Sequence, residues 1–127
     1  MAQIDQTHII NAPIDKVWWA LTTAEGAEQW GAGPAKMNPT DGGEFSYWNG
    51  DIHGTNTEVI PMMLLKQDWY GHDDPTKLYK VTFKFFSPNT TTTEVHLTHS
   101  GEHDDIKKDE ADWQDYYFDP LKKALER

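Results

Sequence analysis

The chain has 127 residues, a length that predicts a single domain over residues 1–127. Its formal net charge of -10 argues against nucleic acid and against anionic membrane surfaces as partners, because both would repel an acidic protein. The sequence has no cysteine, no apolar leader and no apolar run of membrane-spanning length, so we expect a cytoplasmic protein without disulfides or thiol chemistry.

The first quarter of the chain predicts one strand followed by two short helices. Residues 4–10 alternate loosely, as a strand does, and Pro13 suits the first position of a helix. Thr23 is a suitable N-cap for a second helix that ends at Trp30. Trp19 lies off the apolar face of the first helix, and with Trp30 it is where we expect contact with another molecule. The residues of that apolar face, which we expect to be buried, are Ile14, Val17, Trp18 and Leu21.

From residue 41 onward the sequence predicts an antiparallel meander of strands. Asn49-Gly50-Asp51 is a hairpin signal between a strand that carries Phe45 and Tyr47 and a return strand over 52–60. The clearest strand covers 79–85, where apolar and polar residues alternate. Further strands are predicted over 62–69 and 91–99, with a loop at 71–75 and a turn at 87–89.

The last part of the chain predicts one long amphipathic helix, preceded by an acidic, solvated segment at 102–110. Pro120 lies inside the helical pattern and removes one backbone hydrogen bond, so we expect a kink there. The apolar positions of this helix, at spacings of three and four, are Trp113, Tyr116, Tyr117, Leu121, Ala124 and Leu125.

The order of these elements predicts an α+β fold in which a twisted sheet packs against the C-terminal helix. Such a sheet leaves a hollow beneath the helix, and here aromatic side chains would line it. Trp30 and Trp48 lie near segment ends, where the mouth of this pocket would be. The predicted ligand-binding residues are therefore Trp30, Phe45, Tyr47, Trp48, Trp69, Phe83, Trp113 and Tyr117.

Five segments carry a resemblance to a known family: INAPIDKVWWALT, GGEFSYWNGDIHGTNTEVIP, QDW, TTTEVHLTHSG and DWQDYYFDPLKKALE, and the resemblance covers residues 9–125. In their order and spacing they resemble the family of activators of heat-shock protein 90 ATPase, within the helix-grip superfamily also called START or SRPBCC. It implies an antiparallel curved sheet of about six to seven strands wrapped around a long C-terminal helix, with two short helices after the first strand.

The resemblance implies two different functions. Small single-domain relatives are taken to bind small hydrophobic molecules, whereas the eukaryotic co-chaperone carries a similar module as its C-terminal domain and stimulates the chaperone's ATPase. The leading prediction is binding of a small apolar or amphipathic molecule in the cavity. The alternative partner is a heat-shock protein 90-type chaperone.

A metal or cofactor site is not predicted. His96 and His99 form an HxxH pair, but residues i and i+3 of a strand face opposite sides, and zinc needs at least three converging ligands. The glycines at 31–33 and 42–43 do not match a phosphate loop followed by a helix.

A small cyclase or hydrolase-like enzyme remains a further alternative. His53, Glu58 and Gln67 could place polar groups among the aromatic rings, and a carboxylate buried there would have a raised pKa and act as a general acid or base. The sequence is equally consistent with a Glu58 side chain that faces solvent or forms an ion pair with a lysine across the sheet. No nucleophile with an adjacent base is visible, so no catalytic residue is predicted.

Overall fold

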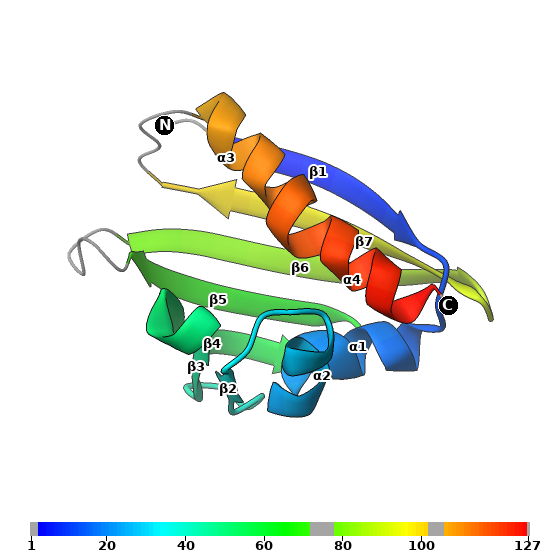
Figure 1. Ribbon diagram of the computed structural model, residues 1–127, viewed down its shortest axis with the longest axis horizontal. Helices are drawn as coiled ribbons and strands as arrows, with labels where there is room; N and C mark the ends of the chain where they lie inside the picture. The colour runs from blue at the N-terminus through cyan, green and yellow to red at the C-terminus, as the bar shows by residue number, and fades with distance from the viewer. Residues whose placement is uncertain (1–2, 72–77, 102–105, 127) are drawn as a thin grey trace.

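The strands form one seven-stranded antiparallel sheet, in the order β1-β7-β6-β5-β4-β3-β2, with the C-terminal helix lying across one face (Figure 1). The computed structural model describes residues 3–71, 78–101 and 106–126. The strands are β1 (Gln3–Ile10), β2 (Lys36–Met37), β3 (Glu44–Tyr47), β4 (Ile52–Ile60), β5 (Leu64–Gly71), β6 (Leu78–Asn89) and β7 (Thr92–Ser100). The predicted α+β architecture and its antiparallel meander are confirmed.

The first strand lies beside the last one. β1 pairs with β7 along its whole length, from Gln3 opposite Ser100 to Ile10 opposite Thr93. The chain then crosses to the opposite edge of the sheet through α1 (Ile14–Thr22) and α2 (Ala24–Gln29), which lie together at one end of the sheet (Figure 1). These two helices therefore close one end of the space under the C-terminal helix.

The starts of both short helices follow from their capping residues. Pro13 is the N-cap of α1 and not its first helical residue as predicted, because its ψ of 151° is extended while its carbonyl already accepts from Val17. The predicted cap of α2 is confirmed: the Thr23 hydroxyl accepts from the backbone N–H of Gly26 at 2.9 Å. On the predicted apolar face of α1, Val17 and Leu21 are fully buried, whereas Ile14 and Trp18 are only partly buried and pack against the core. Trp19, off that face, is 37% exposed.

One strand and two strand boundaries differ from the prediction. The short edge strand β2 lies in a segment expected to be an irregular link, and two residues are too few to show alternation. β5 begins at Leu64 because Met62, with φ of 61°, is still in the turn after Pro61.

β6 continues through the predicted turn at 87–89, and the pairing register shifts between Phe86 and Asn89. Such an irregularity tolerates Pro88, which has no N–H to donate. Of the predicted loop at 71–75, residues 72–75 lie outside the described residues.

The C-terminal helix is continuous but changes its winding. It consists of α3 (Ile106–Asp112), a π-helical segment η2 (Trp113–Phe118) and α4 (Asp119–Leu125). The Asp119 N–H donates to the Gln114 carbonyl, five residues back, which is the π-helical pattern. This widened turn stands immediately before Pro120, where we predicted a kink. Residues 102–105 of the acidic segment lie outside the described residues, while 106–110 belong to α3.

The predicted apolar face of this helix is correct except at one position. Trp113, Tyr117 and Leu121 are buried against the sheet, but Tyr116 is 66% exposed. The π-helical turn offsets the residues before and after it, so a strict helical spacing no longer predicts which side chains face the sheet.

Two polar groups in the core bind the backbone of α1. Tyr47 Oη donates to the Leu21 carbonyl and Trp30 Nε1 donates to the Ala20 carbonyl, each at 2.9 Å. Trp30 is only 4% exposed, so it holds α1 and α2 together and does not lie open at a pocket mouth, where contact with another molecule was expected. Burial raises the pKa of both Tyr47 and Tyr117 well above the ordinary value, so both hydroxyls stay protonated.

β1 is joined to the C-terminal helix by a stacked pair of rings. The His8 and Phe118 ring centroids lie 3.8 Å apart, with the planes only 8° from parallel. Gln6 extends this contact: its Oε1 is 2.8 Å from His8 Nε2, and its Nε2 donates to the Glu110 carbonyl. These contacts tie the open edge strand of the sheet to the helix that lies over it.

Candidate functional site

A cleft with a volume of about 500 Å³ lies between the first half of the C-terminal helix and the sheet. Pockets that hold small ligands are typically about 300–1,000 Å³, so this one suits a small organic molecule. The residues that line it are Trp48, Ile52, Trp69, Tyr70, Tyr79, His99, Asp109, Asp112, Trp113, Tyr116 and Tyr117.

The periodicities of the helix and of the last strand bring these side chains to the cleft. Along β7, every second residue from Thr93 to His99 is buried on one face, which places His99 beneath the helix. Along the helix, the lining residues are Asp109 and Asp112 of α3, which are three residues apart and share a face, and Trp113, Tyr116 and Tyr117 of the π-helical segment.

Trp48 is held in an unusual backbone conformation at the edge of the cleft. It begins the short helical turn η1 (Trp48–Gly50), which joins β3 to β4 where the hairpin was predicted. Its φ of 50° is uncommon for a residue with a side chain, and such conformations cluster at functional sites. The backbone N–H of Trp48 donates to the Ala32 carbonyl at 2.7 Å, which fixes the indole beside Trp30.

The eight predicted ligand-binding residues divide into two groups. Trp48, Trp69, Trp113 and Tyr117 line the cleft. The other four, which lie in the core, are Trp30, Phe45, Tyr47 and Phe83. These core rings support the lining rings: the Phe83 and Tyr117 centroids are 5.7 Å apart, and those of Trp30 and Tyr117 are 4.6 Å apart. Phe45 also borders a second hollow, of about 830 Å³, at the β2–β4 edge of the sheet.

Sequence reasoning missed seven residues of the cleft. They are Ile52, Tyr70, Tyr79, His99, Asp109, Asp112 and Tyr116. The signal for His99 was present, because the alternation that predicted Val95 and Leu97 on the inner face also includes it. The two aspartates were read as part of a solvated acidic run, although they lie one helical turn from Trp113 and Tyr116.

His99 and Trp113 are joined at the floor of the cleft. The Trp113 indole N–H donates to His99 Nδ1 at 2.8 Å. Because an indole nitrogen can only donate, Nδ1 is an acceptor and the ring proton of neutral His99 lies on Nε2. His99 is 8% exposed, and its ring also meets the edge of Tyr79, with centroids 5.2 Å apart. This bond fixes the orientation of both rings.

His96 and His99 diverge as predicted. His96 lies on the outer face of β7, where Nε2 is 2.7 Å from a Glu94 carboxylate oxygen and the ring packs against Phe86. In the described ranges 3–71, 78–101 and 106–126, no three His, Asp or Glu side chains are grouped as a metal site would require.

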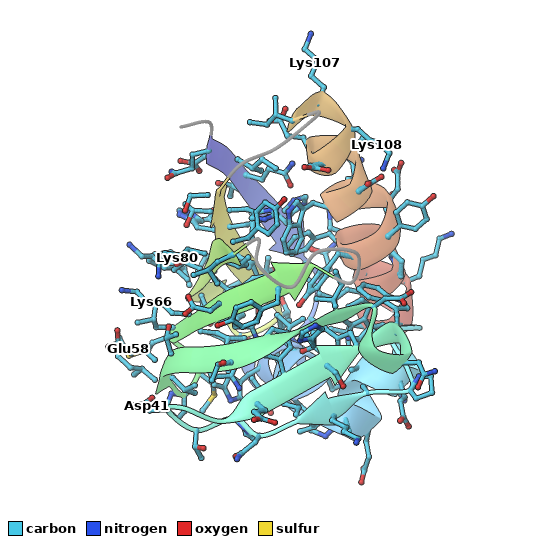
Figure 2. All side chains as sticks on the ribbon, turned by 90° about the vertical axis from the view of Figure 1, so that its left-hand side faces the viewer. Asp41, Glu58, Lys66, Lys80, Lys107 and Lys108 are labelled. Atoms are coloured by element: carbon cyan, nitrogen blue, oxygen red, sulfur yellow. The ribbon has the colours of Figure 1, made fainter. Side chains whose placement is uncertain are left out.

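The three polar residues considered for acid–base chemistry are not assembled in the cleft. Glu58 pairs with Lys66 across the β4–β5 hairpin, at 3.6 Å and largely in solvent, which was the alternative left open (Figure 2). His53 stacks on Tyr70. Gln67 is buried beneath the cleft, but its oxygen accepts from the Trp69 indole at 2.7 Å. A general acid or base built from Glu58 is therefore ruled out by its position.

Gln67 belongs to a buried chain of hydrogen bonds that positions Trp69. Its Nε2 donates to Asn56 Oδ1 at 2.9 Å, and Asn56 Nδ2 donates to the Asn38 carbonyl at 2.7 Å. Each buried polar group in this chain has a partner, so the chain costs little and fixes the indole.

Two carboxyl groups, those of Asp109 and Asp112 on α3, are among the described residues that line the cleft. Asp112 accepts from Lys108 Nζ at 2.8 Å, one helical turn earlier, and this bond raises the pKa of Lys108. Lys107 and Lys108 project from the start of α3, away from the Glu58–Lys66 pair (Figure 2). The Lys108–Asp112 pair is solvent-exposed, and exposed pairs of this kind are weak.

Comparison with known proteins finds a curated relative that is named as a chaperone activator. It is 24% identical over 123 residues to the mouse protein "Activator of 90 kDa heat shock protein ATPase homolog 2", covering 94% of this chain but only 37% of the mouse protein. The chain thus spans little more than a third of that relative. None of the helices in the described part of the chain is long and apolar enough to cross a membrane.

Two solved structures share the fold. The Aha1 dimer from Colwellia psychrerythraea matches with a TM-score of 0.80 and 22% identity, over 98% of this chain and 96% of that one. An HSP90 activator from Plasmodium falciparum matches with a TM-score of 0.76 and 23% identity, over 89% and 88%. These matches confirm the predicted helix-grip fold. A family model matches residues 11–126, and the chain therefore belongs to the family described as "Activator of Hsp90 ATPase homolog 1-like protein".

Proposed function

We propose that this domain binds a small apolar or amphipathic molecule in the cleft beneath the C-terminal helix. The observation that carries the proposal is the cleft itself, about 500 Å³ with walls made mostly of aromatic rings. Rings such as Trp48, Trp69 and Trp113 offer a large apolar surface to a ligand with little loss of side-chain entropy. The indoles of Trp69 and Trp113 are already fixed by hydrogen bonds, so binding would not have to order them.

Binding is tested with the neutral fluorescent probe N-phenyl-1-naphthylamine. We expect saturable binding with energy transfer from tryptophan. Truncating a ring in the wall removes contact area, so Trp48→Ala is expected to weaken binding by about tenfold. Trp19→Ala, a tryptophan truncation on the outside of α1, is the matched control and should leave binding unchanged. Absence of saturable binding, or an equal effect of the two variants, would contradict the proposal.

A second candidate function is regulation of a heat-shock protein 90-type chaperone. It is favoured by the match of nearly the whole chain to the mouse protein named as an activator of that ATPase. We expect the purified chain to bind the heat-shock protein 90 homologue of its own organism and to raise that chaperone's ATPase rate. Calorimetry and a coupled ATPase assay measure the two effects. If neither binding nor a change of rate occurs, this candidate is excluded, whereas the cleft proposal is unaffected.

A further inference from the structure

We propose that this protein forms a homodimer in which strand β1 pairs with β1 of a second copy, antiparallel and with Thr7 on the two-fold axis. The pairing surface is separate from the cleft, because none of the described residues that line the cleft belongs to β1. The proposed dimer therefore does not depend on ligand binding.

β1 is an edge strand with one unpaired side. It has eight residues, and within the described part of the chain its only strand partner is β7. Figure 1 shows β1 as one border of the sheet. Every second residue of an edge strand points its N–H and C=O groups away from the sheet, where they pair readily with another strand. The partner that these groups require is another extended backbone.

The two edges of the sheet differ in how they are protected against pairing. Short length, lysine, proline and bulges are the usual means by which an edge strand avoids a second chain. β2, at the opposite edge, has only two residues, one of which is Lys36. β1 has no lysine, arginine or proline, and it pairs with β7 from Gln3 to Ile10 without a shift of register. β1 is thus the edge that suits a partner strand.

The inward side chains of β1 hold its backbone in place before a partner arrives. Ile4 and Ile10 are fully buried, and the His8 ring stacks on Phe118 of the C-terminal helix. A second strand would therefore meet a template that is already ordered, which lowers the entropic cost of association.

The sequence of β1 favours a second copy as the partner. When identical strands pair antiparallel about a two-fold axis, the residue on the axis lies opposite itself. With Thr7 there, a threonine pair forms at the centre, and such cross-strand pairs are favourable. Ile9, which is 46% exposed, then lies opposite Asp5 of the other copy.

The position of Asp5 selects this register. With Thr7 on the axis, the two Asp5 residues are four residue steps apart along the strands, which is about 13 Å. That separation exceeds the screening distance of about 8 Å in physiological salt. Pairing about Gln6 would bring the two carboxylates within two residue steps, and pairing about Asp5 itself would place them directly opposite each other, which is destabilising.

The formal net charge of -10 works against any dimer of this chain. Salt screens this long-range repulsion but has little effect on the backbone hydrogen bonds of a paired edge, so association should strengthen as salt is added. Strand pairing alone makes a small interface. We therefore expect a dissociation constant on the order of 10–100 µM at high salt.

Sedimentation equilibrium should show a monomer–dimer equilibrium that shifts toward the dimer as salt is added. Thr7→Lys places two ammonium groups on the axis and should leave only monomer. Thr57→Lys alters an exposed threonine on the interior strand β4 and should dimerise as the unaltered protein does. A monomer at every concentration up to about 1 mM, or equal behaviour of the two variants, would overturn the proposal.

Single cysteines test the register, because the chain has no cysteine of its own. Under mild oxidation Thr7→Cys should form a disulfide-linked dimer, and Thr57→Cys should crosslink far more slowly. Asp5→Cys and Ile9→Cys should crosslink when mixed but not separately, since a disulfide needs Cα atoms within about 7 Å of each other. Crosslinking of Asp5→Cys alone as readily as of the mixture would show a different arrangement and overturn the proposal.

Discussion

Trp113→Ala is expected to lower the free energy of unfolding by about 3–5 kcal/mol, the range for removing a buried large aromatic ring. Trp113 is 5% exposed and its ring centroid lies within 6 Å of those of Trp69, Phe83 and Tyr117. Removing it would leave a hole where the helix meets the sheet. It would also remove the donor to His99 Nδ1, a further cost because that acceptor is buried.

Urea unfolding followed by circular dichroism measures this loss. Trp19→Ala is the matched control, since it deletes the same side chain from a position that is 37% exposed, and it should cost less than about 1 kcal/mol. Trp113→Phe keeps a ring but not the indole N–H, so it should fall between the two. A Trp113→Ala loss no larger than that of the control would show that the ring is not part of the core.

The second large effect concerns pH and His8. Burial against Phe118, with a further contribution from the positive charge of Lys122, lowers the pKa of His8 from 6.5 to about 4, while Asp119 acts in the opposite direction. Between these values the unfolded chain binds a proton that the folded protein does not. Stability should therefore be complete above pH 6.5 and fall as the pH drops toward 4. The loss should be on the order of 2 kcal/mol, after allowing for partial solvent access to the ring.

His8→Phe separates this effect from the titration of carboxylates. The variant keeps an aromatic ring on Phe118 but has no group that titrates near pH 6.5. Unfolding free energies of both proteins at several values between pH 7 and pH 4.5 should show a steeper decline for the unaltered chain. Parallel pH profiles would mean that His8 does not contribute to acid sensitivity.

The fold could be predicted from the sequence where one periodicity dominates. The alternation over 79–85 and the apolar face of α1 are local patterns that burial enforces directly. Val81, Phe83 and Phe85 are buried as that alternation requires. β2 could not be predicted, because it is too short to show a period and exists only through its pairing with β3. The turn expected at 87–89 failed because tertiary pairing carries β6 past Pro88.

The cleft was predicted less well than the fold, for a physical reason. Phe83 and Trp69 carry the same pattern signal, since each lies on the inner face of its strand. Whether such a ring fills the core or lines a cavity depends on the distance between the C-terminal helix and the sheet. No local periodicity of the sequence encodes that distance. Asp109 and Asp112 were missed because charged residues in an acidic run are usually exposed to solvent. His99 was missed although the alternation along β7 places it on the inner face of the sheet.

The π-helical segment has a consequence for how this site could have arisen. A π-helical turn is what remains when one residue is inserted into an α-helix without unwinding it. Each residue of an α-helix advances by about 100°, so an insertion rotates everything before it relative to everything after it. Leu121 in α4 can therefore face the core while Asp109 and Asp112 in α3 face the cleft. Removing one residue from the exposed stretch 114–116 would restore a plain helix and rotate α3, with Asp109 and Asp112, by about 100° relative to Leu121.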